Sequence, residues 1–123
     1  MREEANTEIS ILVPLFNEAP NLNLLVEGVV KVMRSLGRTF ELILIDDGSM
    51  DESLEILRAM KNGIPELRVV VLRRNFGQSA AMMAGFDHAR GEIIVSMDGD
   101  LQNDPHDIPP MIALLEEGYD LVS

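Results

Sequence analysis

One stretch decides the fold of this chain: FELILIDDGS, at residues 40–49. Its apolar part shows no regular alternation of polar and apolar side chains, which is typical of a strand covered on both faces of a sheet. Two carboxylates and a glycine follow where such a strand would end. Helical spacing then begins with Leu54, Leu57 and Met60. The stretch therefore predicts a buried strand, a polar loop and a covering helix.

The same succession recurs along the chain. Buried strands are predicted at Ile9–Val13, Phe40–Ile45, Leu67–Leu72, Ile93–Met97 and Tyr119–Val122. Apolar residues at helical spacing lie between them: Leu22, Leu25, Val26, Val29, Met33 and Leu36, then Ala80, Met83 and Ala84, then Ile108, Met111, Ile112 and Leu115. Strict alternation of strands and helices predicts an α/β fold with a mostly parallel, doubly wound, Rossmann-like sheet.

Residues that start and stop helices agree with this pattern. Ser49 and Glu52 have the spacing of a capping box and predict the start of the second helix. Glycines follow each helical pattern, where a left-handed residue is favoured. They are Gly37, Gly63, Gly91 and Gly118.

Composition bounds the class of protein. The chain has 123 residues, a net charge of −11 and no cysteine. The absence of cysteine excludes a disulfide scaffold and a thiolate metal site, and the acidity argues against binding to nucleic acid or to an anionic membrane surface. No apolar run approaches the roughly 18 residues of a membrane span, and the charged start lacks a secretory signal, so we expect a cytoplasmic location.

The domain organisation follows from the pattern of elements. We expect residues 1–8 to be a flexible N-terminus and residues 9–123 to form one domain. The last predicted strand, Tyr119–Val122, has no covering helix after it. We therefore expect the domain to be truncated at its C-terminus.

Polar clusters follow four of the predicted strands, and ligands of open parallel sheets bind at that edge. The most informative cluster is Asp98-Gly99-Asp100, with Gln102 close by. Carboxylate and amide oxygens suit a hard divalent cation, although an Asp-Gly pair is also common in tight turns. We expect these residues and Asp46 to share one anionic cavity, in which a cation bridges the protein to a diphosphate.

The pair Asp46 and Asp47 allows two interpretations. At least one carboxylate can accept a hydrogen bond from a base N–H or a ribose hydroxyl, a role that suits Asp46. Alternatively, Asp47 and Ser49 only begin the second helix.

Other candidates lie after the first and third strands. Pro14 is expected to end or bulge its strand, and Phe16 either offers a flat surface to a base or belongs to the core. Asn17 and Glu18 are either ligand contacts or ordinary loop residues. Arg73 and Arg74 either grip phosphate oxygens, which we expect of one of them, or form surface ion pairs.

Four ordered motifs of this chain resemble those of the family 2 glycosyltransferases. They are ILVPLFNE at residues 11–18, IDDGS at 45–49, RNFGQ at 74–78 and DGDLQ at 98–102. Their order is most similar to the branch that includes dolichyl-phosphate mannose synthases and bacterial undecaprenyl-phosphate sugar transferases. The resemblance runs from about Ile9 to Ser123.

The resemblance implies a GT-A fold and an inverting transfer of a sugar from a nucleotide-diphosphate sugar to an acceptor, most often a polyprenyl phosphate and otherwise a saccharide. It implies Mg²⁺ or Mn²⁺ on the diphosphate. The implied metal ligands are Asp98, Asp100 and Gln102, and the implied donor-binding residues are Pro14, Phe16, Asn17, Glu18, Asp46, Asp47, Gly48, Arg74, Gln78, Asp98 and Gly99.

The resemblance also implies what this chain does not contain. Catalytic and acceptor-binding residues, and any membrane segments, are expected beyond Ser123. The full-length protein would then act at the cytoplasmic face of the membrane in building the cell envelope, and this fragment alone would be inactive. Two alternatives are a nucleotide-sugar-binding module without transfer activity and a phospho-receiver signalling domain.

Overall fold

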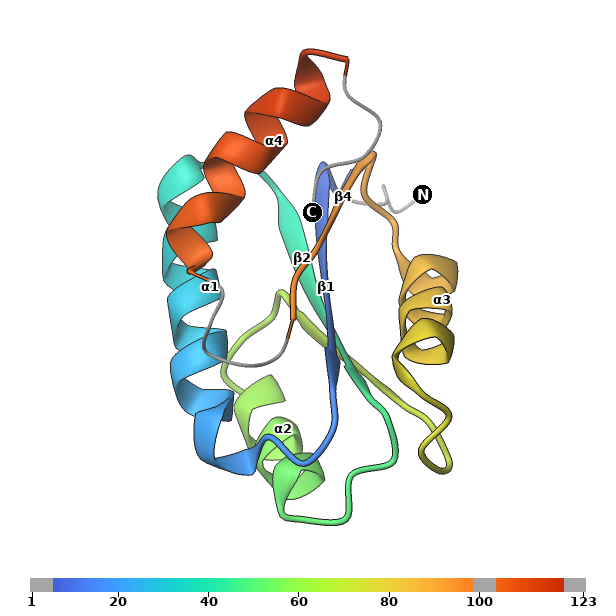
Figure 1. Ribbon diagram of the computed structural model, residues 1–123. Coiled ribbons are helices and arrows are strands. Elements are labelled where there is room, and N and C mark those ends of the chain that lie inside the picture. The colour runs from blue at the N-terminus through green and yellow to red at the C-terminus, as the bar shows by residue number, and fades with distance from the viewer. Residues whose placement is uncertain (1–5, 99–103, 119–123) are drawn as a thin grey trace, which may run out of the picture.

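The computed structural model describes residues 6–98 and 104–118 as a parallel sheet with helices on both faces (Figure 1). Its strands are β1 (Ile9–Leu15), β2 (Phe40–Asp46), β3 (Leu67–Val71) and β4 (Ile93–Ser96), in the order β3-β2-β1-β4. Its α-helices are α1 (Leu22–Leu36), α2 (Ser53–Lys61), α3 (Gln78–His88) and α4 (Ile108–Glu116). Short 3₁₀ helices at Ala19–Asn21 and Pro105–Asp107 precede α1 and α4. The predicted α/β fold is confirmed, and the strand predicted at Tyr119–Val122 lies outside the described residues.

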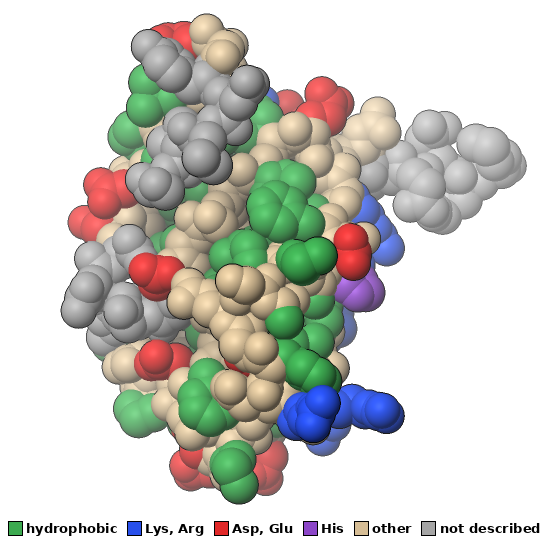
Figure 2. Space-filling view, turned by 45° about the vertical axis from the view of Figure 1, so that its right-hand side comes forward, with side chains coloured by type: hydrophobic (Ala, Val, Ile, Leu, Met, Phe, Trp, Pro, Cys, Tyr) green, Lys and Arg blue, Asp and Glu red, His purple; other side chains and the backbone are tan. Residues whose placement is uncertain are grey.

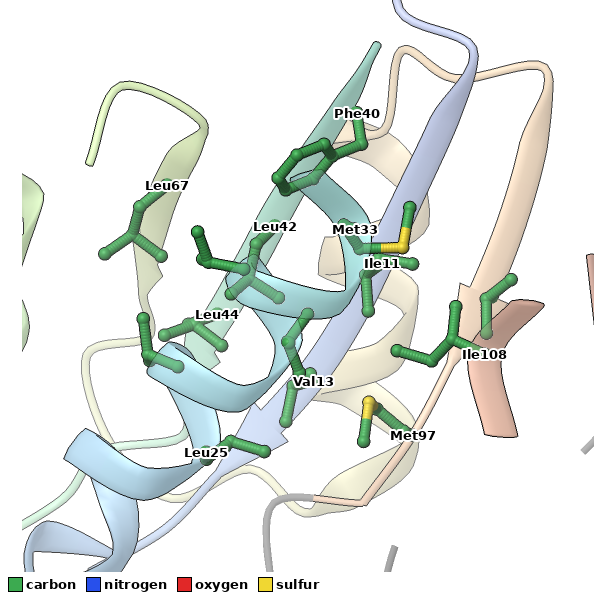
Figure 3. Close-up of a cluster of buried hydrophobic side chains, with 14 of the residues drawn as sticks. Ile11, Val13, Leu25, Met33, Phe40, Leu42, Leu44, Leu67, Met97 and Ile108 are labelled. Carbon is green, nitrogen blue, oxygen red and sulfur yellow. The ribbon is translucent and has the colours of Figure 1, made fainter. Parts of the chain in front are cut away.

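The helices divide unequally between the two faces. Figure 1 shows α1, α2 and α4 on one face and α3 alone on the other. The larger core lies under the three helices, and Figure 3 shows Ile11, Val13, Leu42 and Leu44 of the strands pointing towards Leu25 and Met33 of α1 and Ile108 of α4. Leu12, Ile43, Ile45 and Ala81 form the smaller core under α3. Both faces of β1 and β2 are therefore buried, as their unbroken apolar runs predicted.

The strand register explains why Pro14 is tolerated. β1 pairs with β2 from Ile9↔Phe40 to Leu15↔Asp46, but with β4 only as far as Leu12↔Ser96. The prediction that the strand ends or bulges at Pro14 is wrong, because β1 continues to Leu15. Pro14 faces the side where the pairing with β4 has already ended, so no ladder hydrogen bond is lost there.

The buried face of α3 differs from the predicted one. The sequence pattern pointed to Ala80, Met83 and Ala84, yet Ala81 and Gly85 are the fully covered positions and Met83 is 67% exposed. The helix is apolar on both sides, and Gly85 allows close approach to the sheet, since an added Cβ would lie 2.8 Å from Ile45 Cδ1. In Figure 2, with the α3 side turned forward, hydrophobic side chains gather on the surface.

Substitutions on α3 should report this orientation directly. Ala81→Leu is expected to lower the free energy of unfolding by about 1–3 kcal/mol, because added methylene groups have no room beneath the helix. Met83→Gln is expected to change it by less than about 0.5 kcal/mol, since Met83 is exposed. Urea denaturation would measure both, and equal losses in the two variants would contradict the orientation.

Helix ends depart from the sequence signals at several positions. Gly37 and Gly118 adopt positive φ angles of 70° and 107°, as predicted, whereas Gly63 and Gly91 do not. Gly91 is required for another reason, because a Cβ there would lie 2.6 Å from the Ser10 backbone nitrogen. The capping box predicted at Ser49 is wrong: α2 begins at Ser53, and Ser49 lies in the preceding loop.

A hydrogen-bond network joins the elements at the amino-terminal end of the sheet. Glu41 on β2 is 5% exposed, and its carboxylate accepts hydrogen bonds from the Ser10 hydroxyl at 2.6 Å, the Arg68 guanidinium at 2.6 Å and the Arg90 backbone N–H at 2.7 Å. Arg68 also donates to the carbonyl of His88, the last residue of α3. The Glu41 network thus joins β1, β2 and β3 to the end of α3.

The described part of the N-terminal segment contacts the loop before β2. The Thr39 hydroxyl donates to the Asn6 carbonyl at 2.7 Å, and Glu8 forms an ion pair with Arg38 at 3.3 Å. Arg38 also pairs with Glu116 of α4.

In the described ranges, no helix has the length and apolar character that a membrane span requires.

Candidate functional site

Two neighbouring pockets open where the loops leave the carboxyl-terminal ends of the strands. The first pocket has a volume of about 510 Å³. It is lined by Pro14, Leu15, Phe16, Glu18, Asp47, Asn75, Gly77, Gln78 and Asp98. These residues lie at the end of β1, in the loops that follow the four strands and at the start of α3, so segments far apart in the sequence meet around one hollow.

The second pocket has a volume of about 490 Å³ and lies beside the end of β3. Phe16 and Asn75 line both pockets and therefore form the wall between them. The other lining residues of the second pocket are Asp46, Gly48, Ser49, Met50, Leu54, Val71, Leu72, Arg73 and Arg74. Among the described residues, Asp46 and Asp98 thus line two adjacent pockets. Asp100 and Gln102 lie outside the described residues, so the cavity expected to join all four stays a prediction.

Asp46 has an acceptor that is not used within the described part of the chain. The residue is 1% exposed, and its Oδ2 atom accepts a hydrogen bond from the Ser49 backbone N–H at 3.2 Å. Its Oδ1 atom is buried and has no hydrogen-bond partner among the described residues. A buried acceptor without a donor is costly, so this atom is suited to a ligand N–H or O–H group.

Asp47 points the other way and holds the loop that follows β3. Its carboxylate accepts hydrogen bonds from the backbone N–H groups of Phe76 at 2.8 Å and Gly77 at 3.0 Å, and from the Asn75 side chain at 3.3 Å. Its own backbone N–H donates to the Leu15 carbonyl at 2.8 Å. The alternative that Asp47 begins the second helix is wrong, because α2 starts at Ser53.

The loop after β1 brings Phe16 and Glu18 to the pockets. Phe16 is 41% exposed, so the interpretation of this residue as core is wrong. Asn17 lines neither pocket: its backbone N–H donates to the Ser49 hydroxyl at 2.8 Å, and its side-chain oxygen accepts from Met50 N–H at 2.8 Å. Its positive φ angle of 53° suits a loop asparagine. Asn17 therefore joins the loops after β1 and β2.

An acidic side chain braces the same two loops. Asp51 accepts hydrogen bonds from the backbone N–H groups of Ala19 at 3.2 Å and Ser53 at 2.9 Å. Hydrogen bonding with Ser53, and then with Ala19, holds the pKa of Asp51 below its usual range. The Asp51 carboxylate therefore serves as a loop brace at the start of α2.

The two consecutive arginines lie at the second pocket. Neither Arg73 nor Arg74 has an ion-pair partner within residues 6–98 and 104–118, so the described contacts do not support the surface ion-pair interpretation. The Arg74 guanidinium lies 4.7 Å from the centre of the Phe76 ring. This stacking leaves the edge of the guanidinium able to donate hydrogen bonds.

Asp98 brings a carboxylate to the first pocket from the end of β4. Its Oδ1 atom accepts a hydrogen bond from the Gln78 side-chain amide at 3.1 Å, while the side chain as a whole is exposed. Gly99, Asp100 and Gln102 lie outside the described residues. Among those that are described, no three histidine or acidic side chains are close enough to hold a metal ion. The oxygen chemistry of Asp98 nevertheless fits a hard divalent cation.

Sequence reasoning missed part of this site. Asn75 lines both pockets and contacts Asp47, although it was not among the predicted site residues. Its place within the RNFGQ motif was the available signal. The apolar lining of the second pocket by Met50, Leu54 and Val71 carried no signal, because such residues are indistinguishable from core positions in a sequence.

The fold is that of GT-A glycosyltransferase domains. Glucosyl-3-phosphoglycerate synthase from Mycobacterium tuberculosis, solved in complex with Mn²⁺, uridine diphosphate and phosphoglyceric acid, superposes with a TM-score of 0.70 at 26% identity. The match covers 89% of this chain and 39% of that one. The chain belongs to glycosyl transferase family 2, whose family model matches residues 10–123.

Two relatives are similar over most of this chain. Dodecaprenyl-phosphate galacturonate synthase from Rhizobium johnstonii is 53% identical over 111 residues, which are 89% of this chain and 32% of the relative. Undecaprenyl-phosphate 4-deoxy-4-formamido-L-arabinose transferase from Yersinia enterocolitica is 44% identical over 117 residues, which are 94% of this chain and 36% of the relative. The chain thus spans about a third of the length of these relatives. The family match excludes the phospho-receiver alternative.

Proposed function

We propose that this chain supplies the donor-binding part of an inverting glycosyltransferase that moves a sugar from a nucleotide-diphosphate sugar to a polyprenyl phosphate. The proposal is carried by the buried Oδ1 atom of Asp46, which has no hydrogen-bond partner among the described residues. Asp46 lines the second pocket together with Arg74 and with Phe16, which is 41% exposed. A base N–H or a ribose hydroxyl would satisfy Asp46, Phe16 would stack against the nucleoside, and Arg74 would bind phosphate oxygens.

The first pocket would hold the diphosphate and the sugar. Glu18, Asp47 and Asp98 make its lining acidic, so a diphosphate entering it requires a cation. Asp98, Asp100 and Gln102 would hold Mg²⁺ or Mn²⁺, and Pro14, Gly48, Gln78 and Gly99 would contact the donor nearby. When bound, the cation would neutralise negative charge on the departing nucleoside diphosphate. The Mn²⁺ and uridine diphosphate in the M. tuberculosis relative support this assignment.

The acceptor proposal rests on the relatives. Both are named for polyprenyl phosphates, and an acceptor phosphate oxygen is already anionic, so it needs little help from a general base. A saccharide acceptor would instead require a base, which we expect beyond Ser123 together with any membrane segments. The whole protein would then act at the cytoplasmic face of the membrane.

Nucleotide screening tests the donor site. UDP, GDP, CDP and dTDP would be titrated by calorimetry with and without Mn²⁺. One nucleotide is expected to bind best, and Asp46→Asn should weaken it by about 10- to 100-fold, because a charged acceptor of the base or ribose is lost. Asp98→Ala should reduce affinity with Mn²⁺ to the affinity without it.

Asp87→Ala is the matched control, because Asp87 is an exposed carboxylate of α3 that lines neither pocket. Its nucleotide binding should equal that of the unaltered protein. A folded protein that binds no nucleotide, or that loses as much affinity through Asp87→Ala as through Asp46→Asn, would overturn the proposal. Nucleotide binding without sugar transfer by the full-length protein would favour the alternative of a binding module.

A further inference from the structure

Asp47 is better placed to act on the protein than on a ligand. It is 4% exposed, and its two carboxylate oxygens accept hydrogen bonds from the backbone N–H groups of Phe76 and Gly77. The Asn75 side chain donates to both the carboxylate and the carbonyl of Asp47. These contacts leave the loop at residues 75–77 bound to the end of β2.

The close fit of the neighbouring backbone is a second observation. A Cβ added to Gly48 would lie 2.3 Å from the Arg74 carbonyl carbon and 2.4 Å from the Asn75 nitrogen. Gly77 has a φ angle of 103°, which other residues rarely adopt. The loop after β3 is thus held against the loop after β2 by hydrogen bonds and by contact of the two backbones.

The loop leads directly to a side chain that contacts the candidate metal ligand. Gln78 is the first residue of α3 and follows Gly77. Its side-chain amide donates to Asp98 Oδ1 at 3.1 Å, and within the described part of the chain Asp98 Oδ2 accepts no hydrogen bond. A fixed Gln78 therefore engages one oxygen of Asp98, and the other oxygen is not engaged by any described residue.

From this chain of contacts we infer that Asp47 is a positioning residue, which fixes the loop at residues 75–77 so that Gln78 orients the Asp98 carboxylate towards the metal. The inference rests on the proposed function and deepens it, because it links the loop beside the nucleoside to the diphosphate end of the site. Residues that orient a metal ligand commonly change metal affinity by about 10- to 100-fold when they are replaced.

Titration of the intact protein with Mn²⁺, and with the preferred nucleoside diphosphate in the presence and absence of Mn²⁺, tests the inference. Asp47→Asn is expected to reduce the Mn²⁺-dependent gain in affinity by about tenfold. Nucleotide binding without Mn²⁺ should change by less than about twofold, since a positioning residue does not touch the nucleoside. Gln78→Leu should reproduce both results, and the double variant should lose no more than either single variant.

Amide hydrogen exchange separates positioning from loss of structure. Exchange at Phe76 and Gly77 should accelerate in Asp47→Asn and remain unchanged in Gln78→Leu. Asp51→Asn is the matched control: Asp51 also braces loops through backbone N–H groups, but those of Ala19 and Ser53. It should leave the Mn²⁺-dependent gain unaltered.

Each contrary result has a distinct meaning. An equal loss with and without Mn²⁺ in Asp47→Asn would overturn the inference, because Asp47 would then contact the donor itself. A Mn²⁺-dependent gain in nucleotide affinity that is unchanged in Asp47→Asn would also overturn the inference. If Asp47→Asn does not fold, the Gln78→Leu variant decides the matter by itself. An unchanged Mn²⁺-dependent gain in nucleotide affinity in Gln78→Leu would then overturn the inference. If the unaltered protein binds nucleotide with no Mn²⁺-dependent gain, the metal part of the proposed function fails and the inference falls with it.

Discussion

Replacing Gly48 by alanine is expected to lower the free energy of unfolding by about 3–5 kcal/mol, a loss typical only of severe local strain. Two causes combine at this position. Its φ angle of 73° disfavours a side chain, and the new Cβ would overlap the backbone of Arg74 and Asn75. Because that backbone cannot move without breaking the hydrogen bonds to Asp47, the overlap is not relieved by rotation of a side chain.

Gly37 provides a control with nearly the same backbone conformation. Its φ angle is 70°, but no atom lies within 4 Å of an added Cβ. Gly37→Ala should therefore show the conformational cost alone, about 1–2 kcal/mol. Urea denaturation of both variants measures the difference, and nucleotide titration of Gly48→Ala should show weaker binding. Equal destabilisation of the two variants would contradict the described packing of the loops.

The Glu41 network is expected to give the second large effect. Glu41→Ala should lower the free energy of unfolding by about 3 kcal/mol, because it leaves the buried Ser10 hydroxyl and the Arg68 guanidinium without their acceptor. Arg68 is 25% exposed, so water can partly replace its partner and keeps the loss at the lower end for a buried pair. Nucleotide binding by the folded variant should remain close to that of the unaltered protein.

Acid should remove the same stabilisation. Burial raises the pKa of Glu41, but the hydrogen bonds from Ser10, Arg90 and Arg68 outweigh it and leave the pKa below the ordinary value of 4.5. A carboxyl group whose pKa is lower when folded stabilises the fold above the unfolded value, and this contribution is lost as the pH falls through the folded value. The stability difference between the unaltered protein and Glu41→Gln should therefore be full at neutral pH and shrink below pH 4.5.

Glu66 offers the matched comparison for these measurements. It forms a two-point ion pair with Arg34, at 2.8 and 3.1 Å, but both side chains are partly exposed. Glu66→Ala should cost less than about 1 kcal/mol, as expected for an ion pair at the surface. A loss in Glu66→Ala as large as that in Glu41→Ala would show that burial of the network does not determine its strength.

The strands and the overall fold could be predicted because the sheet is covered on both faces. Unbroken apolar runs marked β1, β2, β3 and β4, and the observed bounds differ by only one or two residues at their ends. The same reasoning placed Pro14, Phe16, Asp46 and Asp98 at one edge, since parallel strands present their carboxyl ends together. The position of both pockets at the carboxyl-terminal edge of the sheet follows from that topology.

The details that failed depend on contacts between distant residues. Ser49 has the local signature of a helix start, but its hydroxyl accepts from Asn17 in another loop, and Asp51 instead braces the entry to α2. The orientation of α3 followed from the space that Gly85 leaves above Ile45, which periodicity does not reveal. Likewise, nothing local distinguishes Asp46 from Asp47, although Asp46 Oδ1 has no hydrogen-bond partner among the described residues and Asp47 binds a loop.

The Glu41 network and the second pocket lie at opposite ends of the same strands. Variation of Met50, Leu54 and Val71 in that pocket therefore leaves the hydrogen bonds that fasten the other end untouched. Under the proposed function, replacing the exposed Met50 and Val71 should change which nucleotide binds best, with little change in the melting temperature. A change of nucleotide preference would then need no compensating mutation at the Glu41 network.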